Sequence, residues 1–229
     1  MITLHYWPTP NGWKVAIMLE ECGLPYTVKA VDIARGDQFA PDFLAISPNG
    51  RIPAITDDDA PGGPLSLFES GAILEYLATK SGQLLPADLH GRFNVLQWLY
   101  WQVGGLGPMA GQLSHFVNYA PEPMPYPLAR YRREYDRLLG VLDRQLKDRE
   151  WLAGDYSIAD IASWPWLVPY RRFGQSLEHL PHVRRWHEAM KSRPAVQRGM
   201  ALGKEWQRSG PLDERARTAL FGEGGTAGK

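Results

Sequence analysis

In the first eighty residues, some segments space their apolar positions as a helix does, and others are short and β-rich or alternate with a period of two. Residues 2–6 (ITLHY) and 65–68 (LSLF) are short and rich in β-forming residues, and 26–32 (YTVKAVD) alternates with a period of two, which predicts strands. The predicted elements are, in chain order, a strand at 2–6, a helix at 11–22, a strand at 26–32, a short helix at 38–45, strands at 52–56 and 65–68, and a helix at 69–79. This βαβαββα order implies a mixed sheet with helices packed on it.

After residue 80 the pattern becomes helical. The segment SGQLLPAD at 81–88 holds Gly, Ser and Pro and few large apolar residues, so it is the predicted linker. Helices are predicted at about 89–118, 126–148, 157–171, 181–190 and 194–206. From Ser209 the chain is polar and contains glycine, so we expect a mobile tail. The expected organisation is an α/β domain at 1–80, a linker at 81–88, an all-α domain at 89–208 and a mobile tail at 209–229.

Composition narrows the class of protein. The 229 residues hold 25 Lys and Arg against 25 Asp and Glu, and this net charge of zero argues against a nucleic-acid-binding surface. Cys22 is the single cysteine, which excludes a C-x-x-C redox pair and fits a reducing compartment such as the cytoplasm. His179, His182 and His187 lack a paired metal spacing, so no metal site is expected. No apolar run has the length of a membrane span or a signal peptide.

Two predicted helix starts carry polar groups suited to binding an anion. Glu69 and Ser70 open the helix that follows the last strand, where free N–H groups and the helix dipole favour negative charge. Ser70 would donate to a carboxylate, and Glu69 would accept from an ammonium group. Both residues are equally typical of a helix start without a ligand, so simple capping stays open as an alternative.

Thr9, Pro10 and Asn11 open the first helix in a similar way. Thr9 is typical of an N-cap and Pro10 of the first helical position, which is the simple structural interpretation. The alternative is that Thr9 and Asn11 donate hydrogen bonds to a thiolate held at this helix start. Tyr6 is expected in the core. Cys22 lies at the far end of the helix and is a poor candidate for a nucleophile.

Four further residues are ambiguous from the sequence pattern alone. Pro53 would ordinarily be a trans proline at the first position of a strand. Arg51, Gln38 and Arg130 would ordinarily be solvated surface side chains. A cation and an amide at Arg51 and Gln38 are also suited to holding a carboxylate.

Several short motifs point to one family. They are TPNG at 9–12, SPNGRIPAI at 47–55, FESGAILEYL at 68–77, LQWLYWQVGGLGPM at 96–109 and YSIADI at 156–161, the last of which is a helix-capping box. With these motifs the chain resembles the cytosolic glutathione S-transferase superfamily, and within it the bacterial nu-class, which is related to the fungal Ure2 group. The resemblance extends to about residue 206. It implies the glutathione transferase fold, with a thioredoxin-like first domain and an all-α second domain, and a homodimer.

The resemblance also implies a glutathione site and assigns residues to it. The residues that hold the peptide would be Gln38, Arg51, Ile52, Pro53, Glu69, Ser70 and Arg130. The Ile52–Pro53 bond would be cis, and the backbone of Ile52 would pair with the cysteine residue of glutathione. Thr9 and Asn11 would be catalytic, because they would stabilise the glutathione thiolate. The ligand would be reduced glutathione, with two molecules per site, or oxidised glutathione.

The implied activity is that of a glutathione-dependent disulfide-bond oxidoreductase. Such an enzyme uses the thiol of bound glutathione in place of a protein cysteine. Its partners would be glutathione and a disulfide or an electrophilic small molecule. Two alternatives stay open: a conventional glutathione S-transferase that conjugates electrophiles or reduces peroxides, and a non-catalytic glutathione-binding regulator.

Overall fold

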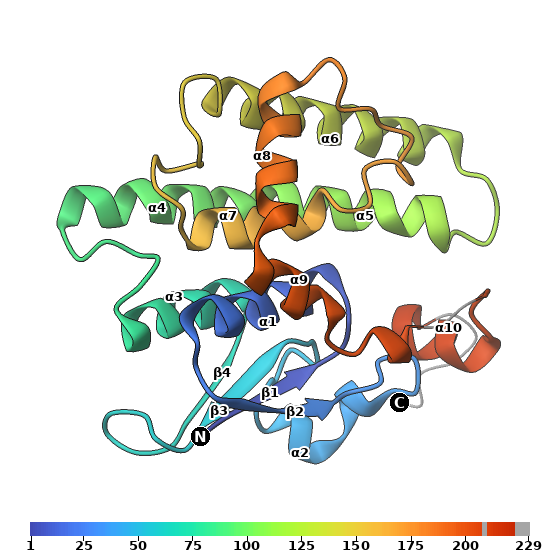
Figure 1. Cartoon of the computed structure of the whole chain (residues 1–229). Helices are drawn as coiled ribbons and strands as arrows, with labels where there is room; N and C mark the ends of the chain where they lie inside the picture. Colours follow the sequence, from blue (N-terminus) through green and yellow to red (C-terminus); the bar gives the residue numbers. More distant parts are fainter. Residues whose placement is uncertain (208–209, 223–229) are drawn as a thin grey trace. The chain divides into compact units, whose positions relative to one another are not determined.

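Two compact units make up the chain in the computed structural model, which describes residues 1–207 and 210–222 (Figure 1). The first unit holds Met1–Ile73 together with the described residues from Arg198 on. The second unit holds Leu74–Gln197. All the named strands of the described chain belong to the first unit.

A mixed sheet forms the centre of the first unit. Its strands are β1 (Ile2–Tyr6), β2 (Tyr26–Ala30), β3 (Ala54–Asp57) and β4 (Leu65–Phe68), in the spatial order β2-β1-β3-β4. β1 pairs in parallel with β2 and antiparallel with β3, and β3 pairs antiparallel with β4. A parallel pair needs a crossover connection, which the first helix supplies. The predicted mixed sheet is thereby confirmed.

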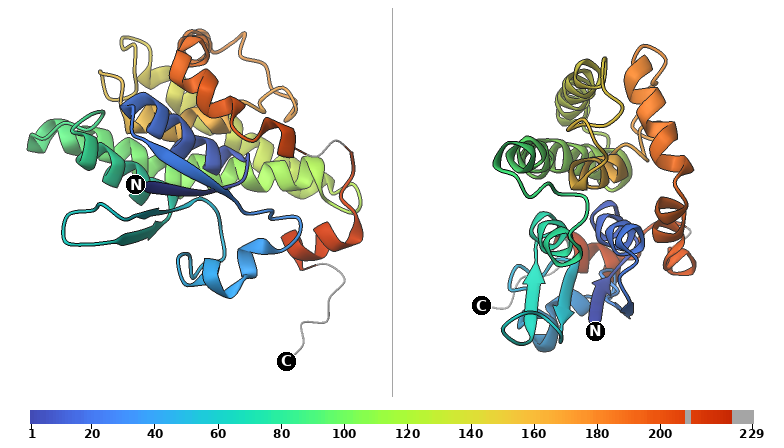
Figure 2. Two further views of the ribbon diagram at one scale, coloured as in Figure 1. Left: turned by 60° about the horizontal axis from the view of Figure 1, so that its bottom comes forward. Right: turned by 60° about the vertical axis from the view of Figure 1, so that its left-hand side comes forward.

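Helices of the first unit cover both faces of this sheet (Figure 2). They include α1 (Pro10–Cys22), the short 3₁₀ helix η1 (Asp37–Phe39) and α2 (Pro41–Leu44). Successive side chains of β1 point to opposite faces of the sheet. The ring of His5 therefore contacts Phe43 of α2, while the ring of Tyr6 lies against Gly12 of α1. A Cβ atom on Gly12 would lie 2.2 Å from the carbonyl oxygen of Trp7, so this position requires glycine.

The second unit is helical. Its elements are α4 (Leu89–Trp101), the π-helical turn η2 (Gln102–Leu106), α5 (Gly107–Asn118), α6 (Pro125–Gln145), α7 (Ile158–Ser163), the 3₁₀ helix η3 (Trp164–Trp166) and α8 (Pro181–Ser192). Two helices, α3 (Ser70–Ser81) and α9 (Pro194–Ala201), cross the boundaries between the units. The helix predicted at 89–118 is continuous, but at Gly104 and Gly105 it takes the wider π-helical form of η2. The all-α character of this region is as predicted.

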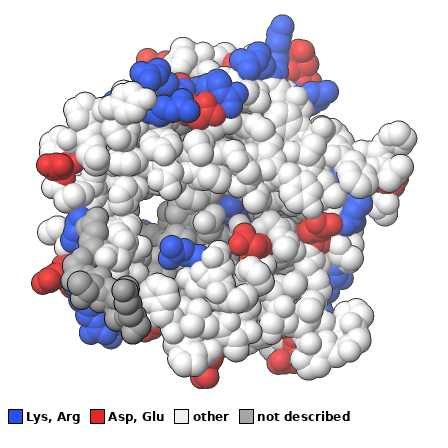
Figure 3. Space-filling model, turned by 180° about the vertical axis from the view of Figure 1, so that it is seen from behind, with Lys and Arg blue, Asp and Glu red and all other residues white. Residues whose placement is uncertain are grey.

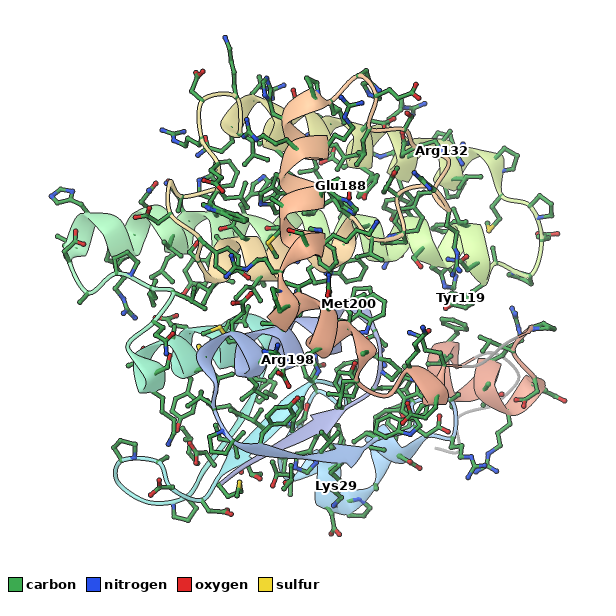
Figure 4. All side chains as sticks on the ribbon, viewed as in Figure 1. Lys29, Tyr119, Arg132, Glu188, Arg198 and Met200 are labelled. Carbon is green, nitrogen blue, oxygen red and sulfur yellow. The ribbon has the colours of Figure 1, made fainter. Side chains whose placement is uncertain are left out.

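The chain beyond Arg198 differs from the expected organisation, in which the helical domain extends to residue 208. It folds with the first unit instead. Arg198, labelled in Figure 4, places its Nε 2.6 Å from Oε2 of Glu20 in α1. The 3₁₀ helix η4 (Lys204–Trp206) follows, and the ring of Trp206 stacks on Trp7 with centroids 5.9 Å apart. These contacts join segments far apart in sequence, which periodicity does not predict.

The tail expected at 209–229 contains regular structure in its described part. Helix α10 (Glu214–Phe221) is capped by Asp213, and its Ala216 is fully buried. Ala216 is the buried residue of this helix, and one small apolar side chain gives the sequence no strong apolar stripe there. Residues 209 and 223–229 of the expected tail lie outside the described residues.

Charged side chains of both signs are interspersed along the upper edge of the face seen in Figure 3. Among residues 1–207 and 210–222, no helix combines the length and apolarity that crossing a bilayer requires. Within the same ranges, no group of three or more His, Cys, Asp or Glu residues is placed to hold a metal ion.

Candidate functional site

A pocket of about 280 Å³ lies in the first unit where four segments meet. These segments are the start of α1, the loop before β3, the end of β4 and the start of α3. The pocket is lined by Asn11, Ser47, Asn49, Arg51, Ile52, Pro53, Phe68, Glu69 and Ser70. Six of the nine residues predicted for the glutathione site therefore share one pocket, although they come from three separate stretches of sequence, at 11, 51–53 and 69–70.

The start of α1 faces this pocket through Asn11. Thr9 is the N-cap, and its Oγ1 accepts a hydrogen bond of 3.3 Å from the N–H of Gly12, while Pro10 takes the first helical position. This bond uses a lone pair of the Thr9 hydroxyl and leaves its proton for another acceptor. Asn11 is half-buried and its side chain lines the pocket. The positive end of α1 and the Asn11 amide are suited to an anionic sulfur.

The loop before β3 supplies the central wall of the pocket. Its Ile52–Pro53 peptide bond is cis, as the resemblance implies. The hydroxyl of Ser47 donates to the carbonyl oxygen of Arg51 at 2.9 Å and fixes the turn. The Arg51 side chain is exposed and lines the pocket, where a guanidinium group is suited to binding a carboxylate.

The start of α3 supplies the opposite polar wall. Glu69 has a φ of +68°, in the left-handed region that non-glycine residues rarely adopt. Such a conformation costs on the order of 1 kcal/mol or more and is often found at functional sites. Ser70, the first residue of α3, is 8% exposed and lines the pocket beside Glu69. A carboxylate, a hydroxyl and a helix N-terminus thus lie together, which suits a ligand carrying both an ammonium and a carboxylate group.

Lys14 lies beneath this wall and was missed by sequence reasoning. It is 2% exposed, although it is charged, and its Nζ lies 3.2 Å from Oγ of Ser70. Burial lowers the pKa of Lys14 to about 7, and the negative charge of Glu69 partly opposes this shift. The available signal was its position in α1, because Lys14 falls among the buried apolar residues Val15 and Met18.

Two predicted ligands lie elsewhere. Gln38 is buried and does not line the pocket, and its Nε2 donates to the carbonyl oxygens of Ile33 at 3.1 Å and Ala219 at 3.3 Å. Arg130 is an exposed residue of α6 in the second unit. It lies near Glu134, whose pKa is held low mainly by hydrogen bonds from Arg137 and partly by Arg130.

The other candidate reactive groups of the first unit are not at the pocket. Tyr6 is fully buried, and its hydroxyl donates to the carbonyl oxygen of Leu202 at 3.1 Å. Burial raises the pKa of Tyr6 strongly, so the expected core role is confirmed and a role as a base is disfavoured. Cys22 is the last residue of α1, at the opposite end from Asn11.

Comparison with known proteins agrees with this geometry. Residues 9–80 match the glutathione S-transferase N-terminal domain, and residues 120–194 match the C-terminal domain of the same family. The chain is 53% identical over 207 residues to the disulfide-bond oxidoreductase YfcG of Escherichia coli (strain K12), covering 89% of this chain and 95% of that protein.

Two solved structures are also similar. A glutathione transferase family member from Pseudomonas fluorescens, crystallised with two glutathione molecules, has a TM-score of 0.82 at 48% identity and covers 87% of this chain and 92% of its own. A glutathione transferase from Pseudomonas putida, with one glutathione disulfide per subunit, has a TM-score of 0.84 at 48% identity and covers 88% and 91%. The chain therefore belongs to the glutathione S-transferase family.

Proposed function

We propose that the chain is a glutathione-dependent disulfide-bond oxidoreductase that uses the thiol of bound glutathione. The observation that supports the proposal is the pocket itself, which is lined by Asn11 at the start of α1 and by Glu69 and Ser70 at the start of α3. The one cysteine of the sequence, Cys22, is not among the pocket's lining residues. The attacking sulfur is therefore assigned to the ligand.

Each chemical group of glutathione has a suitable counterpart in this pocket. Ser70 and the start of α3 would bind the γ-glutamyl carboxylate, and Glu69 would accept from its ammonium group. The Ile52 backbone would pair with the cysteine residue, and Arg51 would hold the glycine carboxylate. Asn11, which lines the pocket, and the N-cap Thr9, which does not, would donate to the sulfur. Unperturbed, a thiol with a pKa of about 8.5 is only a few per cent ionised at neutral pH, so this stabilisation would increase the reactive thiolate.

Gln38 and Arg130 have weaker structural support as ligands. Gln38 would have to release the carbonyl oxygens of Ile33 and Ala219 before its amide could hold a carboxylate. Arg130 is proposed from the family resemblance alone. Pro53 would act by fixing the backbone of Ile52 next to the ligand.

The reaction would proceed by two thiol–disulfide exchanges. The thiolate of the first glutathione attacks one sulfur of the substrate disulfide, forms a mixed disulfide and expels one substrate thiolate. A second glutathione thiolate then attacks the glutathione sulfur of the mixed disulfide and expels the other substrate thiolate. Two glutathione molecules are oxidised to glutathione disulfide, and the substrate is reduced to two thiols. The two glutathione molecules and the glutathione disulfide bound in the two Pseudomonas structures support a site that accepts two glutathione units.

We also propose a homodimer in a reducing compartment such as the cytoplasm. Leu89, Phe93 and Tyr100 are between 57% and 68% exposed, and their spacing places them along one side of α4. An exposed apolar stripe of this kind is typical of an interaction surface. Light scattering on the wild type and on a Phe93→Asp variant tests the assignment, which predicts a dimer for the first and monomer for the second.

The activity is tested by measuring glutathione-dependent turnover of 2-hydroxyethyl disulfide beside conjugation of 1-chloro-2,4-dinitrobenzene. We expect the disulfide to react much faster. Replacing Asn11 by Ala should lower disulfide turnover by about a hundredfold, the usual effect of losing a donor to a developing anion. The matched control is Asn118→Ala, since the Asn118 amide donates within α5 of the other unit.

Three results would change the assignment. Faster conjugation than disulfide reduction would favour the conventional transferase. Turnover of neither substrate, with glutathione bound, would favour the non-catalytic regulator. Unchanged turnover of the Asn11→Ala variant would remove Asn11 from the catalytic role.

A further inference from the structure

A buried lysine is expensive for a protein unless its charge has a use. Moving an ammonium group out of water carries a large free-energy cost, and lysine is rarely fully buried without a partner. Lys14 nevertheless lies in the interior of the first unit, one helical turn after Asn11, where an apolar residue would pack as well. The hydroxyl oxygen 3.2 Å from its Nζ belongs to a residue that lines the pocket, Ser70.

The charge state of Lys14 decides which way the Ser70 hydroxyl points. An ammonium group has only donors, so it must donate to Oγ of Ser70, and the Ser70 proton is then directed to another acceptor. A neutral amine has a lone pair, so it can accept that proton. Ser70 would then turn only lone pairs toward the pocket, where they would repel a carboxylate.

We propose that Lys14 is a positioning residue for the ligand carboxylate at the start of α3: its ammonium group orients Ser70 as a donor toward the pocket and balances the bound negative charge. The proposal rests on the proposed function, because it takes the γ-glutamyl carboxylate of glutathione as that anion. Lys14 does not line the pocket, so it acts through Ser70 and through its charge.

The surrounding charges support this arrangement. Lys14 lies beside the N-terminus of α3, which is the positive end of the helix dipole. The ammonium group and this helix end together favour binding of an anion on the solvent side of both. The charged residues that line the pocket are Glu69, which is exposed beside Ser70, and Arg51 from the loop before β3. Water screens an exposed carboxylate, so Glu69 neutralises Lys14 only in part.

Ligand binding should therefore be linked to protonation of Lys14. In the empty protein burial lowers the pKa of Lys14 to about 7, so much of the amine is neutral above that pH. A carboxylate bound at Ser70 favours the ammonium form and raises this pKa again. Binding above about pH 7 is expected to take up a fraction of a proton.

Calorimetric titration with ligands that separate the groups of glutathione tests the proposal. γ-Glutamyl-2-aminobutyryl-glycine has no thiol, so the ionisation of sulfur does not enter the measurement. Glutaryl-cysteinyl-glycine keeps the carboxylate and lacks the ammonium group, and 4-aminobutyryl-cysteinyl-glycine lacks the carboxylate. Lys14→Met should weaken the first two ligands by about tenfold or more, the effect of losing one partner of a desolvated charge pair. It should leave the third ligand unchanged.

Lys29→Met is the matched control. Lys29, labelled in Figure 4, is an exposed lysine of β2 in the same unit, so this variant removes the same formal charge from the protein. Its affinity for all three ligands should equal that of the wild type. Lys14→Arg, which keeps a permanent positive charge at this position, should bind the first two ligands more tightly than Lys14→Met does.

The wild type alone provides a second test that does not depend on a variant folding. Titration with the thiol-free tripeptide in phosphate and in Tris, at about pH 8, reports the protons taken up through the difference in buffer ionisation heat. We expect uptake at that pH and less at about pH 6, where Bis-Tris replaces Tris. We expect none for 4-aminobutyryl-2-aminobutyryl-glycine, which lacks both the carboxylate and the thiol.

Three results would overturn the proposal: equal losses of affinity for ligands with and without the carboxylate, no proton uptake by the wild type, or no loss of affinity in Lys14→Met. The first would make Lys14 a purely structural residue. If the wild type binds neither glutathione nor the tripeptide, the proposed function itself fails. If the wild type binds both and Lys14→Met binds as well as it does, only the inference about Lys14 fails.

Discussion

Two helix starts in this protein each have a buried ionisable side chain, and they differ in where the hydrogen bonds lead. At the start of α7, Asp160 is fully buried and accepts from the backbone N–H groups of Leu152 and Ser157, the Ser157 hydroxyl and Nε1 of Trp186. At the start of α3, the hydroxyl that Lys14 contacts belongs to a residue of the pocket wall.

The difference separates a role in folding from a role in binding. The donors around Asp160 come from three places in the second unit and saturate its carboxylate. Burial raises the pKa of Asp160 to about 6, although its hydrogen bonds favour the charged form. A closed network of this kind ties segments together. At α3, the hydroxyl that Lys14 contacts belongs to a residue that lines the pocket, so this contact lies beside a cavity that can take a ligand.

The largest effect should be a loss of stability when the acceptor at the centre of the α7 network, Asp160, is removed. Asp160→Ala would leave the indole N–H of Trp186 and two backbone N–H groups buried without an acceptor. At roughly 1–3 kcal/mol for each buried unsatisfied donor, with partial relaxation, we expect a loss of about 3–4 kcal/mol in the free energy of unfolding. Urea denaturation measures it. The control is Asp155→Ala, an exposed carboxylate nearby in the same loop.

For the folded fraction of Asp160→Ala, glutathione affinity should equal that of the wild type. A loss of affinity with intact stability would contradict the separation between the two helix starts.

The second effect should be mainly on binding. Ser70→Ala removes the hydroxyl proposed to donate to the γ-glutamyl carboxylate. A hydrogen bond to a charged group contributes about 1.5–3 kcal/mol, so glutathione should bind about ten- to a hundredfold more weakly. Ser70→Ala also removes the oxygen to which Nζ of Lys14 donates, so a smaller loss of stability should accompany the loss of affinity. Calorimetry and urea denaturation on Ser70→Ala and on Ser66→Ala, an exposed serine of β4, distinguish the two quantities. A large loss of stability without a loss of affinity would make Ser70 a structural cap.

Local patterns in the sequence predict many of the features compared here. The capping box of Ser157 and Asp160 is a short-range feature, and the structure has both of its hydrogen bonds. The strands at 2–6 and 65–68 also match their predicted bounds, because period and composition act over a few residues. Asn11, Arg51 and Ser70 were predicted individually, largely through the motifs that carry the family resemblance.

The remaining features depend on contacts that local patterns do not encode. Lys14 is hidden in an apolar helix face, and only the tertiary structure shows the hydroxyl of Ser70 next to it. The burial of Gln38 depends on Ala219, which lies 181 residues further along the chain. The buried residue of α10 is the small Ala216, and one alanine does not distinguish the sequence of this helix from that of a polar tail.

The third effect is a pH dependence of stability above about pH 7, where Lys14 should contribute and Asp160, whose pKa is about 6, should not. The unfolded chain keeps the Lys14 proton up to its ordinary pKa of 10.5, whereas the folded protein loses it above about 7. Between these values unfolding takes up a proton, so the free energy of unfolding rises with pH by at most about 1.4 kcal/mol per unit. Below this window both states are protonated, and the cost of the buried charge is constant.

Lys14→Met removes this term, so the wild type should be less stable than the variant at neutral pH and should approach it as pH rises. Urea denaturation of both proteins at several pH values between about 6 and 9 measures the difference. If the difference in the free energy of unfolding between the two proteins does not change with pH, the ammonium group of Lys14 is solvated. The contrast between a buried Lys14 and Asp160 would then be wrong.

The smallest effect should come from the start of α1, which combines features of the other two helix starts. Thr9 closes the helix as Ser157 does, by accepting from Gly12, and its proton is proposed to serve the ligand sulfur. Thr9→Ala should therefore lose both functions, with about 1 kcal/mol of stability and a fall in disulfide turnover. Thr9→Ser should retain both. Thr9→Asp should keep the cap but place a carboxylate beside the thiolate, so its stability should hold while turnover falls. Thermal unfolding and steady-state kinetics on the three variants separate the roles, and wild-type turnover in Thr9→Asp would reduce Thr9 to a helix cap.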